Sequence, residues 1–240
     1  RPQWRVALIP SYKAHRVATE SAAGSVEEVP DLLAPQVPVI RDVLGALGIP
    51  IVGASDHEAD DVIGTLASTS RMPVDVVTGD RDLFQLVNDA RAVRVIYTGR
   101  GMSNLEVLTD DALVTKYGVT PAQYADFAVM RGDASDGLPG VAGVGEKTAV
   151  ALLGTYGSLD GIIAAATDPD SGMAPPARAK ILAAAEYLAV APKVVEVVRD
   201  LKLPAFESAP ENPKRLDELS ATWGLGASLE RARAALLHLG

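Results

Sequence analysis

Seven carboxylates in this sequence gather into three short clusters. They are Glu58, Asp60 and Asp61, then Asp80 and Asp82, and then Asp133 and Asp136. Carboxylates repel one another, so a fold that brings several of them together needs cations to neutralise the site. Mg²⁺ and Mn²⁺ are the usual choices for oxygen ligands. The spacing predicts a pocket for hard metal ions, with phosphate chemistry as the first reaction to consider.

The composition confines metal binding to oxygen. The 240 residues include no cysteine and only three histidines, which lie far apart in the sequence. Disulfides and thiolate zinc sites are therefore excluded, and a histidine-built site is disfavoured. With 48% hydrophobic and 22% charged residues, the chain has the composition of an ordinary globular protein with one substantial core. No apolar stretch approaches the ~20 residues of a membrane span, so we expect no membrane partner.

The net charge of −9 argues at first against a nucleic-acid partner. Seven of the 31 acidic residues are the clustered ones, however, and bound metals would neutralise these. Basic residues collect near the N-terminus, between Arg1 and Arg16, and again between Arg178 and Lys202. An acidic protein with basic rims remains compatible with DNA.

The first half of the chain predicts an α/β layer. Short apolar runs with strand composition occupy residues 4–9, 49–52, 74–77 and 94–97. Residues 37–47 and 58–68 have helical spacing, with Gly48 as a C-terminal cap of the first and Ser55 or Asp56 as an N-cap of the second. This alternation predicts a parallel-type central sheet with flanking helices, and sites in such sheets form beyond the carboxyl ends of the strands.

The second half predicts a helical layer. The expected helices are residues 109–117, 121–130, 146–153, 158–165, 176–188 and 193–198. Residues 204–213 are rich in proline and predict a linker, and two short helices are expected within 216–239. Residues 17–36 mix small, acidic and proline residues, which predicts a mobile loop or a partly helical excursion.

Each acid cluster also has a simpler interpretation. Acids in the first turn of a helix complement its dipole, and the other two clusters have the composition of a solvated loop and a polar turn. A dehalogenase-type nucleophile at Asp80 is disfavoured, because Thr78 and Gly79 separate it from the strand and no obvious partner set accompanies it.

A glycine-rich run lies just after the third cluster, with Gly140, Gly143 and Gly145 followed by Lys147 and Thr148. It fails the test for a nucleotide-binding P-loop, because Glu146 interrupts the motif and no strand leads into it. A helix-hairpin-helix turn is the better account. Its glycines let the backbone approach a phosphate, and the next helix offers unpaired N–H groups. Such a turn binds duplex backbone rather than bases.

The ordered motifs are Glu-Ala-Asp-Asp (58–61), Thr-Gly-Asp-Arg-Asp (78–82), Gly-Asp-Ala-Ser-Asp-Gly-Leu-Pro-Gly-Val (132–141) and Gly-Val-Gly-Glu-Lys-Thr-Ala (143–149). Together they resemble the bacterial 5′ nucleases of the flap endonuclease family, which include the 5′-exonuclease domain of DNA polymerase I. Tyr-Lys-Ala-His-Arg (12–16) also resembles the motif at the base of the family's helical arch. The resemblance extends from about residue 10 to residue 203.

The resemblance implies that all seven clustered acids hold two or more Mg²⁺ or Mn²⁺ ions, directly or through water. Two such metals can generate a hydroxide, brace the scissile phosphodiester and stabilise the leaving oxygen. It also implies that Lys13 and Arg16 contact the scissile phosphate or the 5′ strand, that Tyr12 stacks on an unpaired base, and that residues 17–36 form the arch.

For residues 136–149 the resemblance implies a hairpin that grips duplex DNA through Gly143, Gly145, Lys147 and Thr148. It places a potassium ion between the hairpin carbonyls and a phosphate, with Ser135 as a contributor. The expected partners are DNA with a 5′ flap, nick or gap and a DNA polymerase. The expected protein is a cytoplasmic, nucleoid-associated monomer.

We expect a single 5′ nuclease domain over residues 1–240. Its expected parts are the arch (17–36), an α/β metal-site core (37–108), a helical DNA-binding region (109–203) and a linker with C-terminal helices (204–240). The family's first strand and two further metal-binding aspartates should precede Arg1, so we expect either an N-terminal segment ahead of this chain or a fragment with an incomplete metal site.

The leading hypothesis is a flap endonuclease and 5′-3′ exonuclease of DNA replication and repair that uses a two-metal-ion mechanism. Two alternatives stay open: a DNA-junction-binding module without catalysis, which the missing first strand favours, and a single-strand ribonuclease with a similar carboxylate site. The hairpin argues against the ribonuclease, which would not need to grip a duplex.

Overall fold

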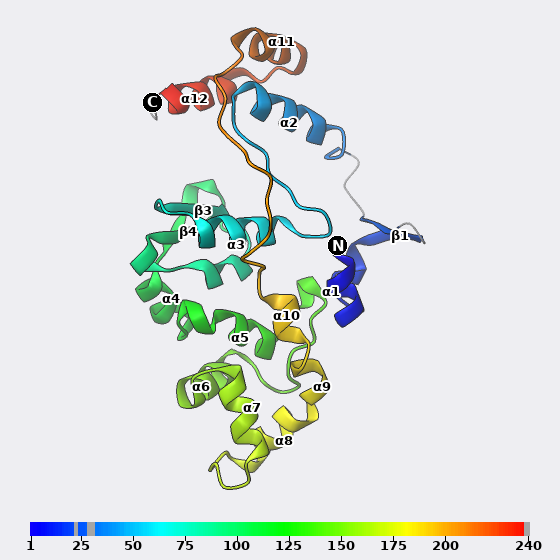
Figure 1. The fold of residues 1–240 in the computed structure, drawn as a ribbon, viewed down its shortest axis with the longest axis vertical. Helices are drawn as coiled ribbons and strands as arrows, with labels where there is room; N and C mark the ends of the chain where they lie inside the picture. Colours follow the sequence, from blue (N-terminus) through cyan, green and yellow to red (C-terminus); the bar gives the residue numbers. More distant parts are fainter. Residues whose placement is uncertain (22–23, 28–31, 238–240) are drawn as a thin grey trace. The chain divides into compact units, whose positions relative to one another are not determined.

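The structure, a computed structural model, describes residues 1–21, 24–27 and 32–237 (Figure 1). The chain forms two compact units. The first comprises Arg1–Val26 and Ala54–Leu201, and the second comprises Glu27–Gly53 and Lys202–Gly240. The boundaries expected for the parts of the nuclease domain stay a prediction.

The central sheet of the first unit is small and mixed. Its described strands lie in the order β3 (Val74–Thr78), β4 (Val93–Tyr97) and β5 (Glu106–Leu108). β3 and β4 are parallel, as predicted, whereas β5 runs antiparallel to β4. The parallel pair brings the carboxyl ends of β3 and β4 to one edge, and the second acid cluster follows β3 at that edge.

Helix α3 (Ala59–Thr69) begins at the first acid cluster. The predicted helix is confirmed, but its N-cap is Glu58 rather than Ser55 or Asp56. Glu58 and Asp61 form a capping box in which each side chain accepts a hydrogen bond from the other residue's backbone N–H. The cluster is thus built into the start of the helix, and its acids complement the helix dipole.

The helical layer of the first unit follows the sheet in the chain and lies beside it in Figure 1. It consists of α4 (Asp110–Tyr117), α5 (Pro121–Arg131), α6 (Glu146–Tyr156), α7 (Leu159–Thr167), α8 (Pro175–Ala183), α9 (Ala185–Leu188) and α10 (Ala191–Val195). Helix α5 is at its centre, because Tyr124, Phe127 and Met130 are each at most 1% exposed. The predicted helix over 176–188 is divided into α8 and α9 at Ala184.

No single helix in the described part of the chain is long and apolar enough to cross a membrane. Helices α6 and α7 pass that test only as a pair bent by 81°. Both contribute to the core of the first unit through Leu153 and Ile162, which are 1% and 0% exposed.

The N-terminal segment corrects one prediction. Residues 4–9 were expected to form a strand, but the structure has helix α1 (Gln3–Leu8) instead. A strand needs a hydrogen-bonding neighbour, and within the described residues no strand pairs with this segment, whereas a helix satisfies its backbone internally. The helix also directs Arg5 into the protein, where it is 2% exposed.

Two short strands occupy part of the segment expected to be a loop or partly helical. β1 (Val17–Ser21) and β2 (Gly24–Glu27) form a separate two-stranded sheet. Residues 22–23 and 28–31 of the expected arch lie outside the described residues. The arch therefore stays a prediction.

The second unit is built from α2 (Gln36–Ala46), α11 (Pro213–Trp223) and α12 (Gly226–Leu237). Ala46, Leu47, Leu216, Leu219 and Leu229 form its core. The strand expected at residues 49–52 is wrong, because these residues have no regular structure. The chain beside it is instead fixed by Ala209, whose N–H donates to the Gly48 carbonyl at 3.0 Å.

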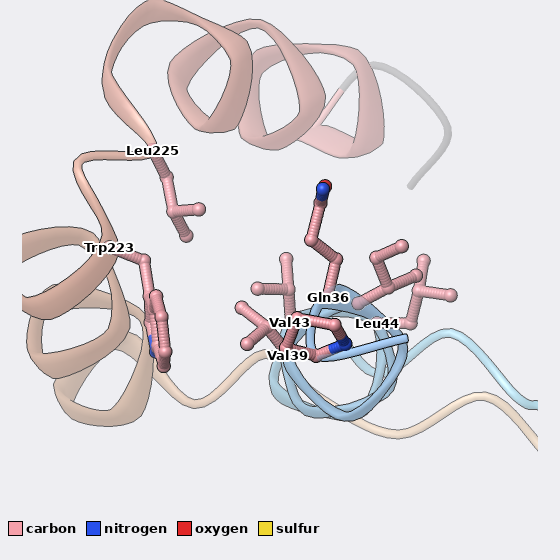
Figure 2. Close-up of a pocket in the computed structure, with 8 residues that line it drawn as sticks. Gln36, Val39, Val43, Leu44, Trp223 and Leu225 are labelled. Atoms are coloured by element: carbon pink, nitrogen blue, oxygen red, sulfur yellow. The ribbon is translucent and has the colours of Figure 1, made fainter. Parts of the chain in front are cut away.

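An apolar pocket of about 490 Å³ lies within the second unit (Figure 2). Helix α2 lines it with Val39, Val43 and Leu44, and Trp223 and Leu225 face them. None of the clustered acids lines this pocket. Its lining is almost entirely hydrocarbon, so it lacks the groups that metal or phosphate chemistry requires.

Candidate active site

Asp61 is the most deeply buried acid of the three clusters, at 0% exposed. Arg5 of α1 donates from Nη1 and Nη2 to its two carboxylate oxygens, at 2.7 Å each. The backbone N–H of Val198 adds a third bond at 2.9 Å. Burial alone would raise the pKa of Asp61, but these hydrogen bonds outweigh burial and hold the pKa below its ordinary value. Its predicted role as a metal ligand stays a prediction, and both of its oxygens are engaged by Arg5.

Glu58 receives three hydrogen bonds from the N-terminal segment. Tyr12 Oη donates to it at 2.6 Å, Lys13 Nζ at 2.7 Å and Arg5 Nη1 at 3.3 Å. Tyr12 is only 3% exposed, and its predicted stacking on an unpaired base stays a prediction. Its hydroxyl fixes the orientation of the Glu58 carboxylate.

The second cluster lies in a tight turn after β3. Thr78 Oγ1 accepts from the Asp80 N–H at 2.9 Å, and Asp80 Oδ1 accepts from the Asp82 N–H at 2.9 Å. Asp82 begins a 3-10 turn (Asp82–Leu86) whose Leu83 and Phe84 are fully buried. The apolar side chains anchor the turn, so the two aspartates are held at the sheet edge.

The third cluster lies in a short turn between α5 and the glycine-rich loop. Asp133 Oδ1 accepts from the Ser135 N–H at 2.7 Å and from Ser135 Oγ at 2.5 Å. Asp136 pairs with Lys13 Nζ at 3.5 Å and with Arg16 Nη2 at 3.0 Å. Lys13 therefore bridges Glu58 of the first cluster and Asp136 of the third.

The backbone of Lys13 is held against the third cluster as well. Its N–H donates to the Asp136 carbonyl at 2.9 Å, and Ser11 Oγ donates to the Gly137 carbonyl at 2.7 Å. Lys13 has a φ of 49°, a left-handed conformation that is unfavourable for a non-glycine residue. The surrounding contacts hold the backbone in this conformation. As a result, the Lys13 N–H lies at the Asp136 carbonyl and its amine lies between the Glu58 and Asp136 carboxylates.

The three clusters act on one another electrostatically. Burial, followed by the charge of Asp80, raises the pKa of Asp60 to about 6. Burial also raises the pKa of Asp82 to about 7, with further contributions from Asp80, Asp136, Asp133 and Asp60. Carboxylates perturb one another in this way only at short range. The fold therefore brings at least one acid of every cluster to a common site.

The chemistry of this site fits a hard divalent cation. Among the described residues, no three histidine, aspartate or glutamate side chains stand close enough to hold one ion in this conformation. Burial, followed by the charges of neighbouring acids, raises the pKa values of Asp60 and Asp82, and a divalent ion would supply the positive charge that keeps these carboxylates ionised. The oxygen-only donor set suits Mg²⁺ or Mn²⁺.

The predicted hairpin residues lie in the loop before α6 and in its first turn. Gly143 has a φ of +72°, and Gly145 is the N-cap of α6, whose first residues include Lys147 and Thr148. Lys180 of α8 donates to the Gly143 carbonyl at 2.8 Å, a contact that the sequence did not indicate. The loop thus combines a helix N-terminus of exposed N–H groups with two amines, which suits a phosphate.

Sequence reasoning missed three arginines of the site. Arg5 had been assigned to a strand, and only the observed helix α1 directs it onto Asp61. Arg81 and Arg131 line an open cavity of about 420 Å³ together with Asp80 and Asp133. Arg81 lies between Asp80 and Asp82, and Arg131 lies two residues before Asp133; these positions beside the acid motifs were the available signal in the sequence.

An α/β layer with acids gathered at its sheet edge, followed by helices and a glycine-rich loop whose chemistry suits a phosphate, is typical of a nuclease. Two family models match consecutive parts of the chain: "5'-3' exonuclease, N-terminal resolvase-like domain" over residues 1–118 and "5'-3' exonuclease, C-terminal SAM fold" over residues 119–215. The chain belongs to the 5′-3′ exonuclease family.

Curated relatives agree with this assignment. The chain is 56% identical to a 5′-3′ exonuclease of Streptomyces coelicolor over 98% of this chain and 80% of that protein. It is 49% identical to a 5′-3′ exonuclease of Mycobacterium tuberculosis over 98% of this chain and 79% of that one. DNA polymerase I of M. tuberculosis is 46% identical over 68% of this chain and 17% of the polymerase. The predicted 5′ nuclease, its hydrolase activity and its kinship with DNA polymerase I are confirmed.

Solved structures share the fold at low sequence identity. Zinc-bound T5 5′-exonuclease matches with a TM-score of 0.62 and 18% identity, over 99% of this chain and 80% of that one. A bacteriophage T5 flap endonuclease complex with DNA and metal ions matches with a TM-score of 0.59 and 17% identity, over 98% and 79%. The predicted α/β fold with a C-terminal helical region is therefore confirmed.

Proposed function

We propose that this 5′-3′ exonuclease is a divalent-metal-dependent, structure-specific enzyme that hydrolyses DNA at 5′ flaps, nicks and gaps during replication and repair. The convergence of the three acid clusters carries the proposal, because burial together with the charges of neighbouring acids raises the pKa of Asp60, Asp82 and Asp136, one from each cluster. The two structures of similar fold support it, since one holds zinc and the other holds DNA with metal ions.

The residues that would hold two or more Mg²⁺ or Mn²⁺ ions are Glu58, Asp60, Asp80, Asp82, Asp133 and Asp136. When bound, such ions lower the pKa of water and neutralise charge on the phosphodiester. Asp61 was predicted as a further ligand, but both of its carboxylate oxygens accept hydrogen bonds from Arg5, so we assign it the role of fixing the start of α3. Without this anchor Glu58 and Asp60 would lose their positions.

Lys13 and Arg16 orient the substrate strand beside the acids. Their cationic groups already lie at Glu58 and Asp136, at 2.7 and 3.0 Å. From this place they donate hydrogen bonds to the non-bridging oxygens of the scissile phosphate and stabilise the negative charge that develops there.

The hairpin holds the duplex away from the cut. Gly143 and Gly145 let the DNA backbone approach the start of α6, and Lys147 and Thr148 donate to its phosphates. A potassium ion between the loop carbonyls and a phosphate, with Ser135 nearby, belongs to the same proposal. Such contacts are independent of base sequence, which suits an enzyme that recognises DNA structure.

The proposal is tested with a 5′-labelled double-flap DNA in Mg²⁺ or Mn²⁺, with products resolved by length. We expect cleavage near the junction that EDTA abolishes. Asp80→Asn should abolish cleavage and leave binding of the duplex intact, because the hairpin is untouched. Full activity of this variant would refute the metal assignment, and cleavage of single-stranded RNA but not of the flap would favour a ribonuclease.

A further inference from the structure

The cavity of about 420 Å³ beside the acids has a mixed lining that the proposed mechanism does not use. Asp80 and Asp133 lie on it, and so do Arg81 and Arg131, with Gly79, Tyr97 and Ser135 completing the wall. Two guanidinium groups next to two metal-site carboxylates are not needed for holding metal. Two guanidinium groups in one cavity favour binding of an anion there.

Arg81 lies between two acids in the sequence and pairs with neither. Among the described residues it forms no ion pair, and its Nε instead contacts Tyr97 Oη at 3.5 Å. Tyr97 is 6% exposed and its ring packs edge-on against Phe84, so it is a fixed support for the arginine. Arg81 is exposed and lines the cavity, and within the described residues its other N–H donors form no hydrogen bond.

Arg131 faces the same cavity from the last turn of α5. Its contacts with Asp133 and Glu146 are 3.7 and 3.5 Å long, beyond the usual range of a strong charge-assisted hydrogen bond. Its guanidinium stacks over Phe127 at 5.3 Å, and its side chain is 17% exposed. Its Nε donates to the Gly132 carbonyl at 3.2 Å, and with the stack this bond holds the planar group in place while, in the described part of the chain, the Nη groups make only the two long contacts.

The charge balance of the lining favours a phosphate once the acids are neutralised. Two arginines and two aspartates cancel in the metal-free cavity. Ions bound by Asp80 and Asp133 would leave the two guanidinium groups in excess. Guanidinium groups match the oxygens of a phosphodiester bidentately, whereas Tyr97, the one aromatic residue of the lining, is only 6% exposed and offers little surface for stacking a base.

We propose that Arg81 and Arg131 form a second phosphate subsite, which binds a phosphodiester of the cleaved DNA strand next to the scissile one. The inference rests on the proposed function, because the cavity adjoins the acids that would hold the metals. The subsite fixes the path of the strand through the site, and its two residues are binding residues for the known reaction.

The test is a methylphosphonate scan. A single neutral methylphosphonate replaces the phosphate at each linkage on either side of the flap junction. Binding is measured by fluorescence anisotropy in Ca²⁺, and initial cleavage rates are measured in Mg²⁺. Arg81→Gln and Arg131→Gln should each weaken binding of unmodified DNA by roughly 10- to 150-fold, the range of one charge-assisted hydrogen bond. At one linkage the effects of variant and methylphosphonate should not multiply, because both remove the same contact.

Arg94→Gln is the matched control. Its guanidinium pairs with Asp75 on the sheet, outside the cavity lining, so binding should be unchanged. Arg81→Lys should retain part of the binding, since it keeps the charge. Arg81 is exposed, so Arg81→Gln carries the test even if Arg131→Gln impairs folding.

Wild-type binding by the glutamine variants, or losses that multiply with the methylphosphonate at every linkage, would overturn the subsite. A wild-type protein that binds flap DNA but does not cleave it would instead contradict the proposed function. In that case the binding scan still decides whether the two arginines contact a phosphate.

Discussion

Arg5 and Asp61 form a bidentate ion pair whose side chains are 2% and 0% exposed. Backbone groups of Val194 and Val198 complete it, so no polar atom of the pair depends on solvent. A buried pair of this kind contributes less to stability than it costs to break, because removing one partner leaves the other charge uncompensated. Because Arg5 also donates to Glu58, the pair links the stability of the protein to the geometry of the candidate active site.

Arg5→Ala should therefore lower the free energy of unfolding by about 3–5 kcal/mol, as expected when one member of a buried pair is lost. Urea titration of the purified variant measures this. The control Arg94→Ala breaks the exposed pair with Asp75 and should leave the urea midpoint unchanged. Equal midpoints for the two variants would mean that Asp61 finds another partner or a proton.

Asp82 makes the metal-free protein sensitive to pH. Its pKa is raised to about 7 in the folded state by burial and by neighbouring acids, against an ordinary value of 3.8. Between these values the folded state binds more protons than the unfolded chain, so the free energy of unfolding falls as pH rises from about 4 to about 7. Asp60, with a pKa of about 6, acts in the same direction.

Asp82→Asn should remove the larger part of this dependence. In EDTA, the variant should be more stable than the wild type above pH 7 and should differ little from it near pH 4. Urea midpoints measured at a series of pH values give the slope for each protein. An unchanged slope would show that the pKa of Asp82 is not raised in the folded protein.

At the scale of elements, the turn that carries Asp133 and Asp136 is locked against the segment that carries Lys13. Gly137 lies at a φ of +70°, and a Cβ there would stand 2.0 Å from the Ser11 carbonyl oxygen. Both features require glycine. The close approach is what allows Lys13 to reach Glu58 and Asp136 together.

Gly137→Ala should push the two segments apart and reduce both stability and cleavage. Gly172→Ala is the matched control, because Gly172 has a φ of +75° with open space around its Cα. The control should show only the cost of left-handed backbone, about 1 kcal/mol, with full nuclease activity. Thermal unfolding and flap cleavage, measured on both variants, compare the two costs. If the two variants lose stability and activity to the same extent, the close approach of Gly137 to Ser11 does not determine the geometry of the site.

At the scale of the whole molecule, the first unit contains the acid site and hairpin, whereas the second unit has its own small core of leucines and alanine. The acids of the first unit come from three separate segments of the chain. Their mutual repulsion opposes folding, so anything that neutralises them stabilises the folded state.

Mg²⁺ or Mn²⁺ should therefore raise the melting temperature. At a metal concentration one hundred times the dissociation constant, the free energy of unfolding should rise by about 2.7 kcal/mol. The gain should be larger at pH 8 than at pH 6, because protons on Asp82 and Asp60 compete with the metal. Differential scanning calorimetry measures the gain. A control in NaCl at the same ionic strength separates specific metal binding from general screening of the charges by salt. A gain that Asp82→Asn retains in full would contradict the assignment of this residue.

Some elements were predictable because their signals are local. The helices from α4 to α7 and the strands β3 and β4 have strong periodicity or clear caps, as with Thr109 at the start of α4. Residues 4–9 and 49–52 were wrongly expected to be strands, since a short apolar run does not reveal whether a neighbouring strand is present. Strand formation depends on such a partner, which no local pattern encodes.

The sequence by itself determined the chemistry of this protein. Residue types and short-range order specify an oxygen-only acid set, a glycine-rich phosphate loop and the family to which they belong. Only the tertiary structure decided that Arg5 neutralises Asp61, that Tyr12 is buried against Glu58, and that Arg81 and Arg131 share a cavity. These are contacts between residues far apart in the chain, and their free energy depends on burial and distance, which exist only once the chain has folded.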